Sequence, residues 1–282
     1  MAKKSRKSFT ARLAAQRVWI QAALLLAWLD PMAVRMHSVC APVFHCYSCP
    51  LATFACPIGV LANFSAIHVI PFIALGTLLA FGAVFGSMVC GWACPFGFLQ
   101  DLIGRIPVPK LTLPAWTGYG RYVVLLVLVL WIPYAYGQDH PAFFCTLCPA
   151  GALEAALPNT ASLAVAGKDL VFPSAVKMAI LLVILLAAFF TYRPWCNLLC
   201  PLGAIYGLCD HFSFLFLRFE PSRCKECDVC RRNCRYGGLS GDRKVNQRCI
   251  RCLECTNCGA ISLSCGLQRK EEAGHVAAPA PE

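Results

Sequence analysis

Cys-Pro-Phe-Gly-Phe-Leu at residues 94–99 is one of four copies of a six-residue motif, Cys-Pro-x-Gly-x-Leu/Ile, on which the fold of this chain depends. The other copies begin at Cys56, Cys148 and Cys200, and each of the four has a further cysteine three, four or seven residues upstream. Proline suits the first position of a helix, and the free N–H groups there stabilise an anionic sulfur. The motif therefore predicts four helices that each begin at a thiolate.

The composition favours a membrane protein. Of the 282 residues 58% are hydrophobic and 14% are charged, and 20 are cysteine. A secreted disulfide scaffold is the other class so rich in cysteine, but such domains are short and less apolar. The sequence shows no Gly-rich nucleotide loop, catalytic triad or paired carboxylates, which favours electron transfer over substrate chemistry.

Four stretches are apolar enough to cross a bilayer core of about 30 Å, which takes about 20 helical residues. The first can also be a signal peptide, but no convincing cleavage site follows it, so we predict a retained helix. The order of span, outer motif, span and inner motif occurs twice. We therefore expect an all-α membrane bundle of four transmembrane helices, a tandem two-helix repeat within residues 18–218. The spans run roughly over Val18–Met36, Ile67–Val89, Tyr119–Tyr136 and Ser174–Tyr192.

The positions of Lys and Arg predict the orientation in the membrane. Residues 1–17 are strongly basic, residues 37–66 contain neither Lys nor Arg, and the chain after the fourth span is basic again. By the positive-inside rule both termini are cytoplasmic, in a multi-pass protein of the bacterial inner membrane. Topology and attraction to anionic membrane lipid account for the net charge of +11, so no nucleic-acid partner is expected. The Ala- and Pro-rich tail, 269–282, is predicted to be disordered.

This orientation sorts the membrane-domain thiols into two candidate metal sites. Packing of the two repeat units would bring the four inner thiols together as ligands of one further iron–sulfur cluster. It would also bring the five outer thiols together, which is more ligands than a second cluster needs. The alternative is that these cysteines only start helices and pack, with quinone as the carrier across the membrane. The inner set is Cys90, Cys94, Cys196 and Cys200, and the outer set is Cys46, Cys49, Cys56, Cys145 and Cys148.

Residues 219–268 have the spacing of a small α+β ferredoxin-like domain with two clusters. The first run has two, two and three residues between its cysteines, as in bacterial ferredoxins, where the fourth cysteine ligates the other cluster. We expect one [4Fe–4S] cluster on Cys224, Cys227, Cys230 and Cys258, and a second on Cys249, Cys252, Cys255 and Cys234. Zinc is the alternative metal. Cys265 lies seven residues beyond Cys258 and can replace it as the last ligand.

Four spans, paired Cys-x3-Cys-Pro motifs and a trailing two-cluster ferredoxin resemble the membrane polyferredoxin family. That family includes the ferredoxin-type membrane subunit of periplasmic nitrate reductase systems and the regulator of nitrous-oxide reductase. The residues that carry the resemblance are Cys90, Cys94-Pro95, Cys196, Cys200-Pro201 and the two ferredoxin runs. It implies an inner-membrane iron–sulfur protein that moves electrons between a cytoplasmic donor or the quinol pool and a periplasmic cytochrome or reductase.

Two other functions remain open at this level. Cys46 with Cys49, and Cys145 with Cys148, form C-x-x-C pairs on an oxidising face, where a thiol–disulfide relay can operate. An assembly or regulatory factor for a periplasmic metalloenzyme would use its clusters as sensors. If quinol is oxidised, Asp139 beside His140 is the candidate proton acceptor.

Overall fold

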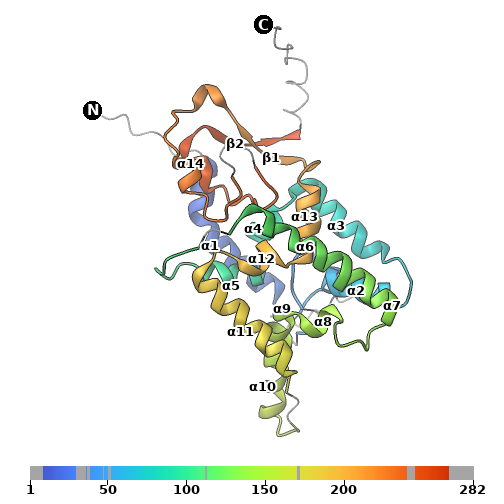
Figure 1. Cartoon of the computed structure of the whole chain (residues 1–282). Helices are drawn as coiled ribbons and strands as arrows, with labels where there is room; N and C mark the ends of the chain where they lie inside the picture. The colour runs from blue at the N-terminus through green and yellow to red at the C-terminus, as the bar shows by residue number, and fades with distance from the viewer. Residues whose placement is uncertain are drawn as a thin grey trace.

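The structure is a computed structural model that describes residues 9–29, 36, 39–46, 48–49, 52–111, 113–169, 172–239 and 245–266. A helical part leads into a small C-terminal module that contains both strands and lies at one end of the molecule (Figure 1). The predicted segments 1–8 and 269–282 lie outside the described residues.

The helical part consists of two units. The first unit contains α1 (Phe9–Trp28), α2 (Pro57–Ala66), α3 (Phe72–Phe85), α4 (Met88–Trp92) and α5 (Pro95–Ile103). The second contains η1 (Ala115–Tyr119), α6 (Gly120–Val123), η2 (Val124–Trp131), α7 (Ile132–Tyr136), α8 (Phe144–Leu147), α9 (Pro149–Gly151), η3 (Ala152–Ala156), α10 (Leu157–Val165), α11 (Ala175–Phe190), α12 (Pro194–Leu198) and α13 (Pro201–Cys209). Elements η2 and η3 are π-helical. Such turns are rare and are frequently found at functional sites.

The two units pack on each other in a reciprocal way. Helix α5, which starts at the inner motif of the first unit, packs on α1 of its own unit and on α11 of the other. Helix α13, its counterpart, packs on α6 and η2 of its own unit and on α3 of the other. Each inner motif is therefore placed by both units.

The helices coincide with the predicted spans but differ from them in length. Among the described residues one helix, Trp116–Tyr136, is long and apolar enough to cross a bilayer, while α2, α3 and α11 are shorter apolar helices. Helix α1 begins at Phe9 rather than Val18, because the buried Arg17 within it has acidic and carbonyl partners. The four-helix membrane bundle stays a prediction.

The C-terminal module is held together by two strands. Strands β1 (Leu215–Phe219) and β2 (Ile261–Cys265) pair antiparallel, with Leu215 opposite Cys265, and enclose η4 (Pro221–Arg223), α14 (Val229–Arg232) and η5 (Glu254–Cys258). The ordered module therefore begins at Leu215, before the predicted boundary at Phe219.

A buried carboxylate joins both units and the module. Asp101, just after the inner motif of the first unit, accepts hydrogen bonds from Arg193 Nε at 2.7 Å and from Tyr236 Oη at 2.9 Å. Arg17 of α1 pairs with the same carboxylate and donates to Gly91 O at 2.9 Å. Burial alone would raise the pKa of Asp101, but the charges of Arg193 and Arg17 outweigh it and hold the pKa below its ordinary value.

Replacing Asp101 by Asn should destabilise the protein by about 3–5 kcal/mol, because Arg193, 1% exposed, would be left as an uncompensated buried charge. Thermal unfolding in detergent measures this, with Asp139→Asn, at an exposed carboxylate, as the control. The contribution of the ionised carboxylate should be fully present above the ordinary Asp pKa of about 3.9 and be lost as the pH falls below it. Equal unfolding temperatures for the two variants would refute this role.

Candidate iron–sulfur centres

All four Cys-Pro-x-Gly motifs start helices, as predicted. Each cysteine is the N-cap residue with an extended backbone, and proline follows at the first helical position. The Cys148 sulfur accepts the Gly151 N–H at 3.5 Å. In every copy burial raises the pKa of the thiol, and the N–H of the motif's glycine acts in the opposite direction. The motif thus offers a backbone donor to each sulfur.

The glycine of the motif also makes room for a cation. A Cβ at Gly97 would lie 3.0 Å from Arg193 Nη1, one at Gly151 would lie 3.3 Å from Lys177 Nζ, and one at Gly203 would lie 3.8 Å from Arg121 Nη1. Thiolate ligands concentrate negative charge, which is costly to bury without a positive partner. At Gly97 and Gly151 a Cβ would crowd the basic side chain, whereas at Gly203 it would be in ordinary contact with Arg121.

The structure brings the four inner thiols together. All are buried within one large hydrophobic cluster, which also contains Cys56 and Cys148, and the inner thiols lie near enough to raise one another's pKa. Two side chains of the Asp101 region also fix this set: Gln100 Nε2 donates to Cys196 Sγ at 3.4 Å, and Arg193 Nη1 donates to Cys90 O at 2.6 Å. The set is Cys90, Cys94, Cys196 and Cys200.

The ferredoxin runs share one backbone conformation. Glu226 and Asp228 in the first run, and Arg251 and Leu253 in the second, have φ between +48° and +64°. These residues stand between successive cysteines, and the left-handed conformation turns neighbouring amides toward the thiols; Arg251 N–H, for example, donates to Cys249 Sγ at 3.4 Å. The equivalence of the two runs supports one cluster on each.

The structure gathers one of the two predicted ligand sets of the module in one cavity. This cavity of about 20 Å³ is lined by four thiols, Cys234, Cys249, Cys252 and Cys255. Cys258 packs on the hydrophobic cluster that contains Cys230, whereas Cys265 lies in β2. Cys224 is half-buried and Cys227 is exposed. The arrangement favours Cys258 over Cys265 as the last ligand.

Cysteine thiolates are ligands of both zinc ions and iron–sulfur clusters. Among the described residues no three His, Cys, Asp or Glu side chains are placed to hold one metal ion. Iron–sulfur clusters are bound by cysteine thiolates whose sulfurs accept hydrogen bonds, as the sulfurs in this chain do from backbone N–H groups.

The module sits directly on the inner thiol set. A Cβ at Gly91, between Cys90 and Cys94, would overlap the carbonyl oxygen of Ile250, between Cys249 and Cys252. Trp92 Nε1 donates to Arg251 O at 3.0 Å in the same contact. Glycine at position 91 therefore allows the second ferredoxin site to lie against the inner set.

The structure gathers most, but not all, of the predicted outer thiols in one place. Four of the five predicted thiols line one cavity, and Cys49 is not among its lining residues. The proposed quinol residues lie elsewhere: Asp139 is exposed, and the His140 ring packs at 5.0 Å from that of Tyr136.

Sequence reasoning did not find the residues that surround the thiols. Asp101 and Gln100 follow the inner motif of the first unit directly, and Arg193 stands three residues before Cys196. The available signal was charged and amide residues inside apolar segments, because such groups are buried only when they have partners.

Comparison with known proteins agrees with this chemistry. A 4Fe–4S binding domain matches residues 67–114 and 176–218, which are the second long helix and inner motif of each unit. The resemblance to the membrane polyferredoxins is confirmed. No solved structure matches the chain.

Several relatives are electron-transport or ferredoxin-type proteins by name. YccM of Escherichia coli, named as a candidate electron transport protein, is 26% identical over 71% of this chain and 55% of its own length. The regulatory protein NosR of Stutzerimonas stutzeri is 28% identical over 60% of this chain and 23% of its own length. The methylamine utilization ferredoxin-type protein MauN of Methylobacillus flagellatus is 28% identical over 58% and 60%. The chain thus spans about half the length of YccM. The chain is thus similar to proteins that are named for electron transport or as ferredoxin-type proteins.

The ligand assignment predicts different outcomes for two neighbouring cysteines. In the anaerobically purified full chain, Cys258→Ser should remove the electron paramagnetic resonance signal and iron of one ferredoxin cluster, because it removes a thiolate packed near Cys230. Cys265→Ser is the matched control and should keep the iron and the resonance signals of both ferredoxin clusters. Loss of iron in the Cys265 variant, with full iron in the Cys258 variant, would reverse the assignment.

Proposed function

We propose that this protein is a membrane-bound electron carrier that connects a cytoplasmic electron donor with a periplasmic redox partner. Electrons pass between the C-terminal module and the inner thiol set, and from there toward the outer thiols. The observation that carries this proposal is the direct contact between Ile250 of the module and Gly91 of the inner set. Where clusters are bound, they supply the one-electron chemistry; the protein supplies thiolates, amide donors and cations around them.

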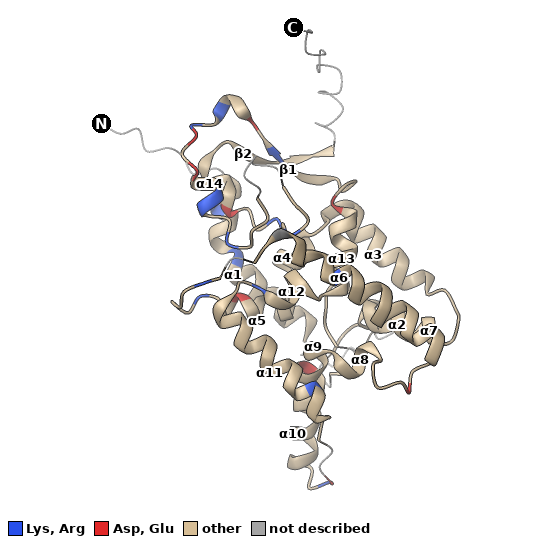
Figure 2. Ribbon diagram, in the orientation of Figure 1, with Lys and Arg blue, Asp and Glu red and all other residues tan. Residues whose placement is uncertain are grey.

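The surface supports a membrane location. Helix α3 exposes Phe72 and Ile73, and α11 exposes Leu182 and Val183, all by more than half of their surface. Exposed apolar patches of this kind mark contact with lipid or another protein. Figure 2 shows Lys and Arg gathered near the module end, while α3 and α7 carry no charged residue. The uncharged helices fit the apolar core of a bilayer, with the module on the basic side.

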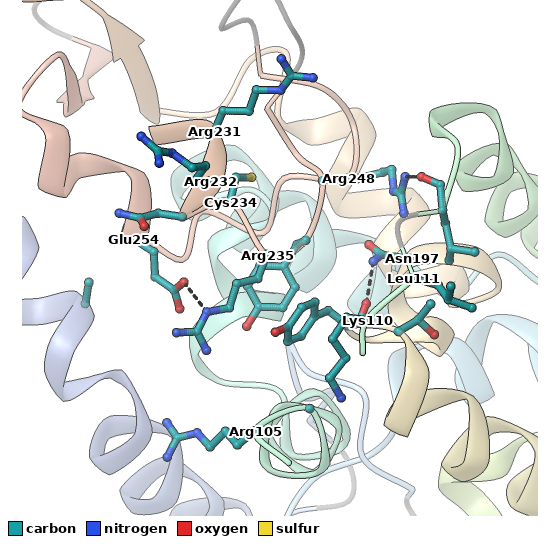
Figure 3. Close-up of a pocket in the computed structure, with 18 of the residues that line it drawn as sticks. Arg105, Lys110, Leu111, Asn197, Arg231, Arg232, Cys234, Arg235, Arg248 and Glu254 are labelled. Atoms are coloured by element: carbon teal, nitrogen blue, oxygen red, sulfur yellow. Dashed lines mark hydrogen bonds and ion pairs between the residues drawn. The ribbon is translucent and has the colours of Figure 1, made fainter. Parts of the chain in front are cut away.

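The module also offers an entry point for electrons. A pocket of about 1020 Å³ lies between the module and the loop that follows α5 (Figure 3). Cys234 lines it, Glu254 is its one acidic lining residue, and Arg235 Nε pairs with Glu254 at 3.2 Å. Such a charge balance favours an acidic donor and accelerates its encounter. Its basic lining residues are Arg105, Lys110, Arg231, Arg232, Arg235 and Arg248.

Transport across the membrane can be tested in quinone-free lipid vesicles that contain the full chain and enclose cytochrome c. A reduced flavodoxin added outside is a small acidic donor that cannot cross the lipid. We expect the enclosed cytochrome to be reduced in vesicles whose chains expose the module outward, and not in empty vesicles or with Cys94→Ser. Reduction that needs added quinone would contradict a thiol-ligated path.

The pocket predicts a salt-sensitive donor reaction. Arg231→Glu combined with Arg232→Glu should slow electron uptake from flavodoxin at least tenfold at low ionic strength, because the encounter loses its attraction. Arg223→Glu is the matched control, since this module arginine is exposed and does not line the pocket. Stopped-flow bleaching of the clusters measures the rate. Equal slowing by both changes would show that overall charge, not this pocket, matters.

A further inference from the structure

Four thiols line a second cavity, remote from the module. It has a volume of about 230 Å³ and lies where α2, α8 and α9 meet, at the other end of the helical part (Figure 1). The thiols come from separate segments of the chain: the loop before α2, the start of α2, helix α8 and the start of α9. These thiols lie near enough to raise one another's pKa, and Cys49 raises the pKa of Cys46 in the same way. The four thiols that line the cavity are Cys46, Cys56, Cys145 and Cys148.

The geometry selects these four from the five predicted outer thiols and also leaves out Cys40. Cys46 Sγ lies 3.6 Å from the position of a Cβ on Gly151, the same glycine whose N–H donates to Cys148 Sγ. These two sulfurs therefore flank one residue. Cys49 does not line the cavity, and Cys40 packs in a separate hydrophobic cluster with Ala55 and Ala74.

Charged side chains fix this site. Lys177 Nζ donates a hydrogen bond to Cys145 O at 3.2 Å. The same nitrogen lies 3.3 Å from the position that a Cβ on Gly151 would take. Glu154 Oε2 accepts the Cys46 N–H at 2.9 Å and lies 3.0 Å from His45 Nδ1. Lys177 thus brings a positive charge to the thiols, and the Glu154 carboxylate holds the backbone that presents Cys46.

The outer cavity is also connected to the inner set. Phe44 lines the cavity, and its carbonyl oxygen lies 4.0 Å from Cys94 Sγ. Its ring packs at 6.4 Å from that of Phe96 in the inner motif and at 6.3 Å from that of Phe144 beside Cys145. One residue therefore contacts both thiol sets.

We propose that Cys46, Cys56, Cys145 and Cys148 ligate one [4Fe–4S] cluster, with Cys49 and Cys40 outside the ligand set. This rests on the proposed function and extends it: the cluster takes one electron from the inner centre, which is oxidised, and gives one electron to a periplasmic acceptor, with no bond made or broken. Lys177 is a positioning residue that favours the reduced, more negative form of the cluster.

The test compares cysteines of the same face in the anaerobically purified full chain. Cys56→Ser and Cys145→Ser should each lose the iron and sulfide of one cluster while the ferredoxin signals persist, which shows that the chain has folded. Cys49→Ser and Cys40→Ser are the matched controls and should keep all iron. Equal loss in Cys49→Ser, full iron in Cys56→Ser, or zinc in place of iron would overturn the assignment.

Redox titration gives a readout that does not depend on iron loss. Lys177→Met should lower the midpoint potential of one cluster and leave the others unchanged, because a positive charge near that cluster is removed. Lys168→Met, at an exposed position, should shift none. If no potential moves in Lys177→Met, the cluster does not lie at this cavity. If vesicle transfer proceeds although Cys56→Ser retains all iron, this assignment fails while the proposed function stands.

Discussion

The buried ion pair between Asp101 and Arg193 is the interaction on which the arrangement of the thiols depends. One carboxylate holds an arginine from the second unit, an arginine from α1 and a tyrosine from the module. A buried pair of this kind contributes little net stability compared with apolar packing, but losing one partner is costly. The pair instead sets the relative position of the two halves of the inner set. Arg193 stands three residues before Cys196 and donates a hydrogen bond to Cys90 O.

The repeated motif solves the problem of burying sulfur ligands. Burial raises the pKa of a thiol and disfavours the thiolate that a metal requires. Each copy counters this with a helix start and a glycine N–H, and in two copies the glycine leaves space for Arg193 or Lys177. The cations at Gly97 and Gly151 come from a different segment than the motif they face. The thiol sites are therefore assembled between segments rather than within them.

Local spacing predicted much of this site because its rules are local. The full motif Cys-Pro-x-Gly starts a helix in all four copies, and the turns at Glu226 and Arg251 lie in the two-residue gaps of the ferredoxin runs. Helix lengths were not predictable from hydropathy: α3 begins after Pro71 and ends at Gly86, whose φ is +55°. Asp101 with Arg193, and the choice of Cys46 over Cys49, depend on contacts between residues far apart in the chain, which no local pattern records.

We propose that the module, the inner thiols and the outer thiols form one series of redox centres. Stepwise reduction of the anaerobically purified full chain, followed by electron paramagnetic resonance, tests it most directly. We predict more unpaired electron spins in the reduced protein than two ferredoxin clusters can supply. The resonance lines should be broadened by magnetic coupling between neighbouring clusters, and this broadening should be smaller in Cys94→Ser. Spins for two clusters only, with line shapes identical in the wild type and in Cys94→Ser, would contradict it.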